Sequence, residues 1–274
     1  MIKGRQMTAA AFAALAVLAC VATNADAAQC GSSAGGFEAW KGQFAEEARA
    51  KGIGAGAISG LMGTHYASAT IAADRGQRSF GLSLDQFLAK RGASAIVSRG
   101  RGLKQSQGAL FASIQQRYGV PPGPLLAIWG METGFGSQRG NQNMLSSIAT
   151  LAYDCRRSEY FTEQLYAALK LIDRGSLSAS TRGSMHGEIG QTQFLPKNIL
   201  AYGTGNLDVA ANALNSTANF LKAHGWRAGA GYQPGEANFA AIQAWNAATV
   251  YQRAIALMGR QIDGGGGGGD GAER

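Results

Sequence analysis

The stretch Leu125-Leu-Ala-Ile-Trp-Gly-Met-Glu132-Thr-Gly-Phe-Gly136 is apolar almost throughout until it reaches a single carboxylate. Such a continuous apolar run predicts a helix that is buried on all sides. Pro124 precedes the run and suits the first position of a helix, where its missing N–H is not needed. Gly134 suits a left-handed C-terminal cap. The stretch therefore predicts a buried helix with Glu132 in its last turn.

Two effects in that position disfavour the ionised form of Glu132. One is removal from water, and the other is the negative end of the helix dipole. A carboxyl group that stays protonated near neutral pH is what a general acid requires. Glu132 is therefore a candidate catalytic acid. The alternative is a structural glutamate that pairs with Arg139 or caps a turn.

Hydrophobic periodicity predicts helices along most of the remaining chain. Ser83 is the expected N-cap of one of them. Residues 70–79 are polar and are predicted to be irregular. No segment shows the alternation of β-branched residues that marks a strand, so the predicted fold is mostly α. The other predicted helices span residues 37–51, 57–62, 84–90, 105–118, 145–151, 159–174, 209–221 and 239–258.

Residues 1–27 have the features of a secretory signal peptide. Lys3 and Arg5 form its charged start, residues 8–21 its apolar core, and Ala25-Asp-Ala27 its cleavage pattern. The apolar run is short for a membrane span, and no other candidate span follows. Lipid attachment at Cys20 is the alternative, which the residues before that cysteine fit poorly. We expect an exported protein whose mature chain begins near residue 28.

The mature chain is basic, with 23 Lys and Arg against 16 Asp and Glu and a net charge of +7. In an exported protein this charge suggests an anionic partner such as a cell-wall polymer or lipid headgroups, or it serves solubility alone. Nucleic acid is not expected, because residues 99–104 form the only basic cluster. A run of glycines predicts that residues 264–274 form a disordered tail after a single domain at 28–263.

Two cysteines, Cys30 and Cys155, remain after cleavage of the signal peptide. An even pair in an oxidising compartment favours one disulfide. The histidines at 65, 186 and 224 have no metal-ligand spacing among themselves or with the cysteines. The chain also lacks a Gly-x-Ser-x-Gly elbow and a phosphate-binding loop. We therefore expect no metal and no cofactor.

A polar loop at residues 184–193 brings hydrogen-bonding side chains together among glycines. Such a set suits the hydroxyl and acetamido groups of a sugar chain, although an ordinary surface loop could have the same composition. Tryptophan rings could add stacking faces or could simply belong to the core. The side chains concerned are Ser184, His186, Glu188, Gln191 and Gln193 in the loop, and the rings are Trp129, Trp226 and Trp245.

A set of motifs in one order supports a specific resemblance. The set is similar to the membrane-bound lytic transglycosylase B family of bacterial cell-wall enzymes, from about residue 37 to residue 259. Each motif alone is modest, whereas the ordered set is specific. The motifs are Gly119-Val-Pro-Pro, Gly130-Met-Glu132-Thr-Gly-Phe-Gly136, Gly190-Gln-Thr-Gln193-Phe-Leu-Pro196, Ala223-His-Gly-Trp226 and Ala241-Ile-Gln-Ala-Trp-Asn246, followed by Tyr251.

The resemblance implies a lysozyme-like α-helical fold with a glycan groove between a larger and a smaller lobe. It also implies a monomeric periplasmic enzyme that cleaves peptidoglycan between N-acetylmuramic acid and N-acetylglucosamine without water. Glu132 would be the catalytic residue, and Arg156 and Arg157 would bind carboxylates of the peptide stems. The expected glycan-binding residues are Ser184, Gln191, Gln193, Asn246 and Tyr251.

The chemistry agrees with a single acid. Ordinary glycosidases use two carboxylates, but one suffices if the acetamido oxygen of the substrate attacks the anomeric carbon. Glu132 would first protonate the leaving oxygen and then take the proton from the muramyl 6-hydroxyl, which closes a 1,6-anhydro ring. Ser184 or Asn246 could orient the acetamido group.

The chain departs from the family pattern at three places. Small residues are common in the family where His186 and Glu188 stand, so Glu188 could serve as a second carboxylate in a lysozyme-type hydrolase. Residues 203–208 are too short and too poor in acids for the calcium loop of some members. The lipid-anchor cysteine is doubtful. A peptidoglycan-binding scaffold without turnover is the remaining alternative.

Overall fold

The computed structural model describes residues 28–76 and 81–264, so the predicted signal peptide with Cys20 and residues 265–274 of the predicted tail lie outside the described residues. Within these ranges the chain is mostly α-helical, as expected. The elements are η1 (Ala34–Gly36), α1 (Phe37–Ala50), α2 (Ala55–Met62), α3 (Ser68–Arg75), α4 (Leu84–Arg91), α5 (Ala93–Ser106), α6 (Gly108–Tyr118), α7 (Pro122–Thr133), β1 (Gln142–Asn143), α8 (Met144–Tyr153), α9 (Ser158–Asp173), β2 (Arg182–Gly183), α10 (Pro196–Tyr202), α11 (Ala210–Ala223), α12 (Phe239–Trp245) and α13 (Thr249–Asp263).

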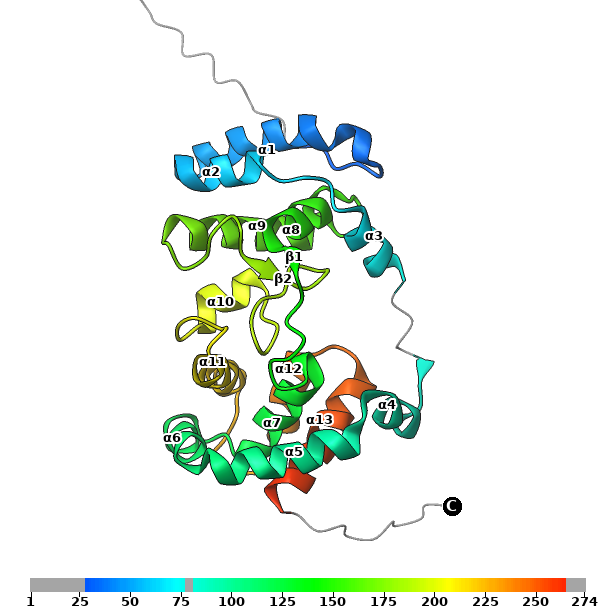
Figure 1. Cartoon of the computed structure of the whole chain (residues 1–274), viewed down its shortest axis with the longest axis vertical. Coiled ribbons are helices and arrows are strands. Elements are labelled where there is room, and N and C mark those ends of the chain that lie inside the picture. Colours follow the sequence, from blue (N-terminus) through cyan, green and yellow to red (C-terminus); the bar gives the residue numbers. More distant parts are fainter. Residues whose placement is uncertain (1–27, 77–80, 265–274) are drawn as a thin grey trace, which may run out of the picture.

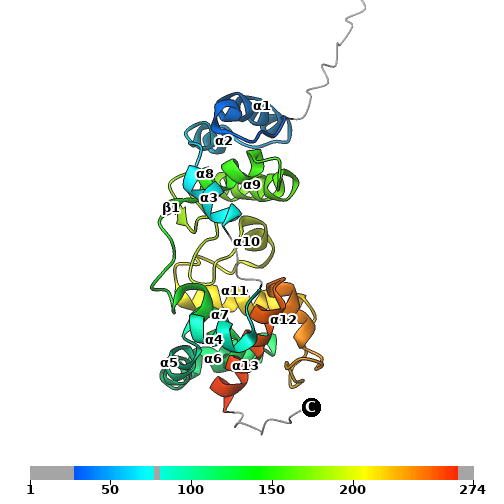
Figure 2. The same cartoon turned by 90° about the vertical axis from the view of Figure 1, so that its right-hand side faces the viewer.

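The helices form two lobes that are stacked along the long axis of the molecule (Figures 1 and 2). The upper lobe contains α1, α2, α3, α8 and α9, and its core runs from Phe37 to Ile189. The lower lobe contains α4 to α7 and α11 to α13, and it encloses the larger core. Ile199 of α10 packs against both cores. No helix of the described residues is long and apolar enough to cross a membrane.

Helix α7 is the buried helix that the apolar run predicts. Its residues from Gly123 to Met131 are all buried. The helix ends at Gly134, whose φ of 56° and ψ of 45° form the expected left-handed cap. The prediction for Pro124 is wrong by two residues, because Pro122 takes the first helical position after an extended Pro121.

Helix α13 crosses α7 at two glycines. A Cβ atom on Gly123 would lie 2.2 Å from the carbonyl oxygen of Gly259, and one on Gly259 would lie 3.0 Å from the nitrogen of Pro124. The crossing is therefore a close backbone contact that no larger residue fits. The carboxylate of Asp263 accepts the N–H of Gly123 at 2.8 Å and fixes the end of α13 against the start of α7.

The predicted single helix at 239–258 is wrong, because the chain breaks it into α12 and α13. Asn246 is extended, with φ of −146° and ψ of 134°. Its Oδ1 atom accepts the N–H of Ala248 at 2.9 Å, which gives the backbone a local partner in place of the helical one. Asparagine competes with helical hydrogen bonds in this way, and here it starts a new helix in a new direction.

The structure also corrects residues 70–79, since α3 extends to Arg75. Two of the three buried residues of α3 are polar: Thr70 donates to Ser147 at 3.1 Å, and the side chain of Asp74 is almost fully buried. Helix α5 carries Gly100 directly under Ile262, where a Cβ would come within 2.7 Å of Cδ1. Helix α10 likewise follows the polar loop without an apolar period, and none of these helices was expected.

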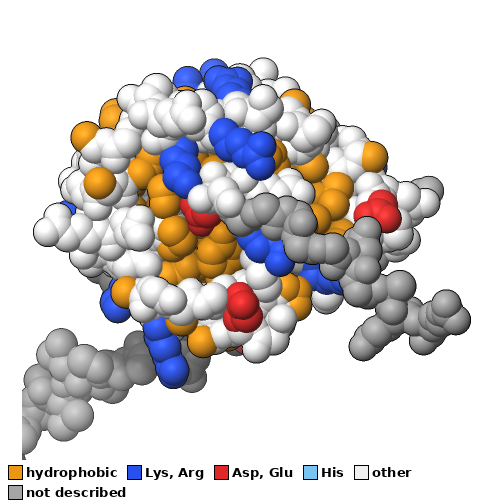
Figure 3. Space-filling view, turned by 90° about the horizontal axis from the view of Figure 1, so that it is seen from below, with side chains coloured by type: hydrophobic (Ala, Val, Ile, Leu, Met, Phe, Trp, Pro, Cys, Tyr) orange, Lys and Arg blue, Asp and Glu red, His pale blue; other side chains and the backbone are white. Residues whose placement is uncertain are grey.

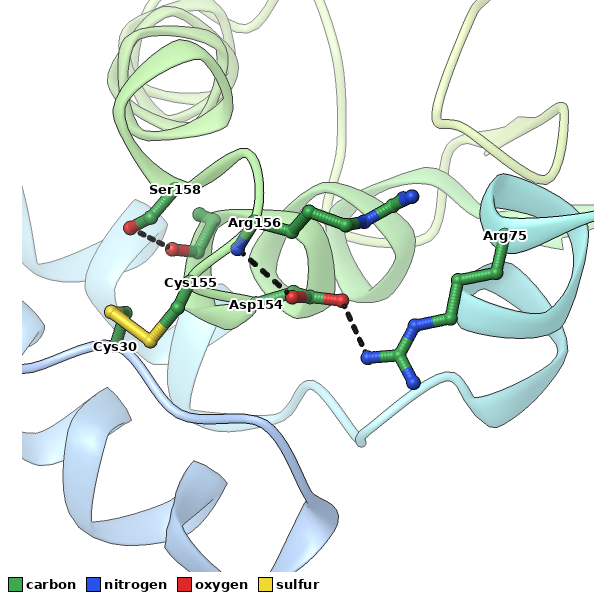
Figure 4. The surroundings of a disulfide bond; sticks show 7 residues. Cys30, Arg75, Asp154, Cys155, Arg156 and Ser158 are labelled. Carbon is green, nitrogen blue, oxygen red and sulfur yellow. Dashed lines mark hydrogen bonds and ion pairs between the residues drawn. A yellow bond between two sulfur atoms is a disulfide. The ribbon is translucent and has the colours of Figure 1, made fainter. Parts of the chain in front are cut away.

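The predicted disulfide joins Cys30 and Cys155, which are 125 residues apart in sequence (Figure 4). Backbone hydrogen bonds continue the connection, because Gly31 donates to Tyr153 at 2.9 Å and receives the N–H of Cys155 at 3.2 Å. Arg75 of α3 reaches Asp154 at 3.2 Å beside the bridge. The start of the described chain is thus fastened to the turn that precedes α9.

Reduction of this disulfide is expected to lower the thermal stability of the protein. The intact bond closes a loop of 125 residues and lowers the entropy of the unfolded chain, which stabilises the folded protein by an amount on the order of 4 kcal/mol. Reduction removes this stabilisation. Calorimetry with and without reductant measures the loss, and a Cys30→Ser/Cys155→Ser variant should melt at the reduced temperature under both conditions. Identical melting of oxidised and reduced wild type would contradict the expectation.

Candidate functional site

Glu132 lies at the last turn of α7, in the wall of a cavity of about 450 Å³ between the two lobes. The glutamate is partly exposed, and the exposed part faces this cavity. The remaining wall comes from α9, the loop before α10, and the break between α12 and α13. Its residues are Arg157, Tyr160, Phe161, His186, Glu188, Gln193, Phe194, Leu195, Asn198 and the segment Ala244–Ala248.

Two donors converge on one oxygen of the Glu132 carboxyl group. The O–H of Tyr251 donates to Oε1 at 2.8 Å, and the indole N–H of Trp245 donates to the same atom at 3.1 Å. Burial and the nearby charge of Glu132 raise the pKa of Tyr251 well above its ordinary value, so its hydroxyl remains a donor. Within the described ranges no donor reaches Oε2, which leaves that oxygen to carry a proton toward the cavity.

Burial raises the pKa of Glu132 from 4.5 to about 7, and the negative charge of Glu188 adds to this rise. The hydrogen bonds from Tyr251 and Trp245 and the charge of Arg91 oppose it, because they stabilise the carboxylate. The alternative pairing with Arg139 is wrong, since that guanidinium binds Asp208 at 2.8 Å. Glu132 is thus a carboxyl group that both gains and loses a proton near neutral pH.

The polar loop is held by a short antiparallel ladder between β1 and β2 and by its own hydrogen bonds. The hydroxyl of Ser184 donates to Oε2 of Glu188 at 2.8 Å, and its oxygen accepts the N–H of the same residue at 3.1 Å. Gly187 and Gly190 adopt left-handed φ angles of 82° and 76° against Ile148 and Leu207, where a side chain would collide. This geometry turns Glu188 into the cavity.

Gln193 occupies an unusual backbone conformation at the cavity wall. Its φ is 54°, which is uncommon for a residue with a side chain. Ile189 and Phe194 exchange two backbone hydrogen bonds of 2.9 and 3.0 Å around it. The side-chain amide of Gln193 donates to the carbonyl oxygen of Gly190 at 2.8 Å. The tight turn supports the strained residue and points this segment at the site.

The arginine pair is anchored by a buried carboxylate of α3. Arg157 binds Asp74 at 2.8 Å, and Arg156 also contacts this side chain. The guanidinium of Arg157 lies over the ring of Phe161, 4.8 Å from its centroid. His186 lies 3.9 Å from Asp74, and burial lowers the pKa of this histidine, which favours its neutral form.

The cavity brings together three of the predicted substrate-binding residues with Glu132, namely Arg157, Gln193 and Asn246. Four others lie outside its lining, and each has an internal partner. Ser184 holds Glu188, Arg156 contacts Asp74, and Tyr251 donates to Glu132. Gln191 accepts the N–H of Trp129 at 2.9 Å and donates to the carbonyl of Asp208 at 2.7 Å.

Sequence reasoning missed three residues of the site. The sequence predicts Trp245 as a ring for stacking or for the core, whereas its N–H also donates to the acid. Its place next to Asn246 is the available signal. Asp74 fell in a segment that was expected to be irregular. Tyr160 lines the cavity from the exposed side of its predicted helix. Hydrophobic periodicity identifies only residues on the buried side, so it gives no signal for Tyr160. In the described part of the chain, no three His, Cys, Asp or Glu side chains are grouped to hold a metal ion.

A family model described as Transglycosylase SLT domain matches residues 36–235. The chain belongs to this transglycosylase family. The match includes Glu132, the arginine pair and the whole polar loop, and it stops before the break between α12 and α13. Residues Trp245 and Tyr251, which donate to the acid, therefore lie beyond the matched region.

Individual members of the family resemble the chain to different extents. Membrane-bound lytic murein transglycosylase B of Escherichia coli K12 is 36% identical over 120 residues, which make up 40% of this chain and only 33% of that protein. SltB3 of Pseudomonas aeruginosa, solved with NAG-anhNAM-pentapeptide, superposes with a TM-score of 0.76 at 29% identity, over 84% of this chain and 80% of that one. Slt35 of E. coli gives 0.72 at 22% identity, over 86% and 96%, which shows the shared fold.

The protonation of Glu132 is expected to respond in opposite directions to two substitutions. Tyr251→Phe removes a donor to the carboxylate and should raise the pKa of Glu132 above about 7. Glu188→Gln removes a negative charge and should lower it. Loss of the hydrogen bond from Tyr251 is expected to alter the acid dissociation constant roughly tenfold, the effect of a hydrogen bond to a charged group. Loss of the Glu188 charge should change it in the opposite direction. Carbon-13 NMR titration of glutamate carboxyl groups measures both, with Glu46→Gln as the control; equal values in all variants would contradict the assignment.

Proposed function

We propose that the protein is a lytic transglycosylase that cleaves the bond between N-acetylmuramic acid and N-acetylglucosamine in peptidoglycan. The observation that carries the proposal is one carboxyl group, Glu132, with a pKa of about 7 and a free oxygen in the wall of a cavity between the lobes. Membership of the transglycosylase family and the likeness to a Pseudomonas enzyme crystallised with peptidoglycan fragments support it.

In the first step the neutral Glu132 donates its proton from Oε2 to the oxygen that links the two sugars. The acetamido oxygen of the muramyl residue attacks the anomeric carbon as the bond to the leaving sugar breaks. The resulting carboxylate remains hydrogen-bonded through Oε1 to Tyr251 and Trp245. These two donors stabilise the charge without removing the acid from the cavity.

In the second step the same carboxylate takes the proton of the muramyl 6-hydroxyl group. The freed oxygen attacks the anomeric carbon, the bond to the acetamido oxygen breaks, and a 1,6-anhydro ring closes. Glu132 is then neutral again. A pKa of about 7 suits a group that must act as acid and then as base in one cycle.

Substrate contacts are assigned to the residues that reach the cavity. Asn246 has its Oδ1 engaged by Ala248, which leaves its amide N–H₂ to orient the acetamido group. Gln193 would bind sugar hydroxyls. Arg157, held in place by Asp74, would bind a carboxylate of the stem peptide. Supporting roles are assigned to residues that do not line the cavity and are bonded within the protein, namely Ser184, Gln191, Arg156 and Tyr251.

We assign residues 1–27 as a signal peptide, residues 28–263 as the catalytic domain and the periplasm as the site of action. The disulfide between Cys30 and Cys155 supports this location, because such bonds persist in oxidising compartments. The partners are glycan strands with their stem peptides, which carry carboxylates that match a mature chain with a net charge of +7.

A second candidate function follows from Glu188, which lines the same cavity as Glu132. One of its oxygens accepts the hydroxyl of Ser184, and within the described residues its other oxygen has no donor. A second carboxylate in this place could activate water, and the enzyme would then be a lysozyme-type hydrolase. Both candidates use Glu132 as the acid, and their products differ by one molecule of water.

Substitution of Glu132 by Gln is expected to abolish glycan cleavage, with a loss on the order of 10²- to 10⁴-fold, because Gln cannot transfer a proton. Purified glycan strands are incubated with wild type, with Glu132→Gln and with Glu46→Gln, an exposed control. Mass spectrometry of wild-type products should give fragments lighter by one water than hydrolysis would. If wild type gives hydrated reducing ends and the Glu188→Gln variant does not, the enzyme is the hydrolase. Cleavage by Glu132→Gln would refute both candidate functions.

The rate of cleavage is expected to fall as pH rises through about 7. The pKa of Glu132 is raised, so its proton is present below this pH and is lost above it. Measurement of kcat/KM between pH 5 and pH 9 tests the expectation, because this ratio reports ionisation of the free enzyme. The Glu188→Gln variant should lower the pKa of Glu132 and so shift the alkaline limb of this profile to lower pH. A limb that stays in place would argue against Glu132 as the titrating acid.

A further inference from the structure

A second cavity, of about 510 Å³, shares Glu132 with the first and extends to the side of α4 and α5. Three basic residues line it, Lys90 and Arg91 from the end of α4 and Arg99 from α5. Glu132 is the only acidic residue in its lining. The two cavities therefore meet at the acid, and the second is strongly cationic.

These cations are exposed, and no described carboxylate lies within ion-pair distance of them. Among residues 28–76 and 81–264, no carboxylate forms an ion pair with Lys90, Arg91 or Arg99, whereas Arg157 across the site is paired with Asp74. Figure 3 shows the underside of the lower lobe, where several Lys and Arg side chains lie around an apolar area together with a few acidic ones. The local potential therefore favours an anion at this end of the groove.

Aromatic rings hold the two guanidinium groups in position. The Cζ atom of Arg91 lies 5.3 Å from the ring centroid of Phe87 and 5.7 Å from that of Tyr251, and Cζ of Arg99 lies 5.0 Å from that of Phe135. Stacking on a ring uses the face of a guanidinium group and leaves its N–H donors at the edge. The donors are thus oriented before a ligand arrives, which lowers the entropy cost of binding.

The geometry points to a second anion-binding subsite, in which Lys90, Arg91 and Arg99 bind carboxylates of a stem peptide on the opposite side of the cleaved bond from Arg157. This inference rests on the proposed function, since a muramyl residue with its peptide occurs at every second sugar of the strand. A strand that lies across Glu132 carries peptides on both sides of the acid. Arginine binds such carboxylates through paired N–H donors.

The test compares strands that carry stem peptides with strands from which an amidase has removed them. Wild type should cleave the peptide-bearing strands with the higher kcat/KM. In Lys90→Gln/Arg99→Gln this preference should fall roughly three- to tenfold, the effect of two exposed ion pairs, and it should fall through KM. Arg91 is left intact because it faces Glu132. Arg117→Gln, which removes another exposed arginine stacked on a ring, 5.4 Å from the centroid of Tyr118, should keep the wild-type preference.

An unchanged preference in the double variant would overturn the inference. Inorganic phosphate is added to both kinds of strand in a further assay. If it inhibits the cleavage of stripped strands as strongly as the cleavage of peptide-bearing strands, the site binds phosphate instead of stem peptides. Calorimetric binding of a peptide-bearing disaccharide to Glu132→Gln, with and without the double substitution, gives a readout without turnover. If wild type cleaves neither kind of strand, the proposed function fails. Weaker binding of the disaccharide after the double substitution would still support the subsite in that case.

Discussion

The site depends on one oxygen atom, Oε1 of Glu132, which accepts hydrogen bonds from both Tyr251 and Trp245. The two donors are six residues apart. In an uninterrupted helix their side chains would point about 120° apart, because each residue turns by about 100°. The extended conformation of Asn246 separates α12 from α13 and lets both side chains reach the same atom. The break in the helix is therefore what assembles the acid.

Charge is distributed unevenly around this acid. Glu188 raises the pKa of Glu132, while Arg91 lowers it, and both residues line cavities that meet at the same carboxyl group. On the upper lobe a buried aspartate, Asp74, partly neutralises the arginine pair. On the lower lobe the guanidinium groups of Arg91 and Arg99 lie over aromatic rings, and among the described residues no carboxylate forms an ion pair with them. The groove thus has two carboxyl groups, Glu132 and Glu188, at its centre and basic side chains at both ends, a pattern that suits a sugar chain with acidic branches.

The sequence predicts those features that have local causes. The apolar run before Glu132, the cap at Gly134 and the N-cap at Ser83 each follow from a few adjacent residues. The pairing of Cys30 with Cys155 follows from the compartment.

Features that arise from distant contacts could not be predicted in this way. Helix α3 buries Thr70 and Asp74 because their polar partners lie on α8 and in the turn before α9. Helix α5 tolerates a glycine because Ile262 fills the space above it. The pairing of Trp245 with Glu132 joins residues 113 positions apart. Asn246 alone carried a local signal for the helix break, and helical periodicity on both sides obscured it.

The close crossing of α7 and α13 at Gly123 and Gly259 fixes the distance between Glu132 and Tyr251, which lie farther along the same two helices. Gly123 and Glu132 are nine residues apart on one helix, or about 13 Å at 1.5 Å per residue, and Gly259 and Tyr251 are separated by a similar length on the other. A methyl group at the crossing would force the two rods apart and carry the phenol away from the carboxyl group. Two glycines that do not line the cavity therefore hold the phenol of Tyr251 within reach of the acid.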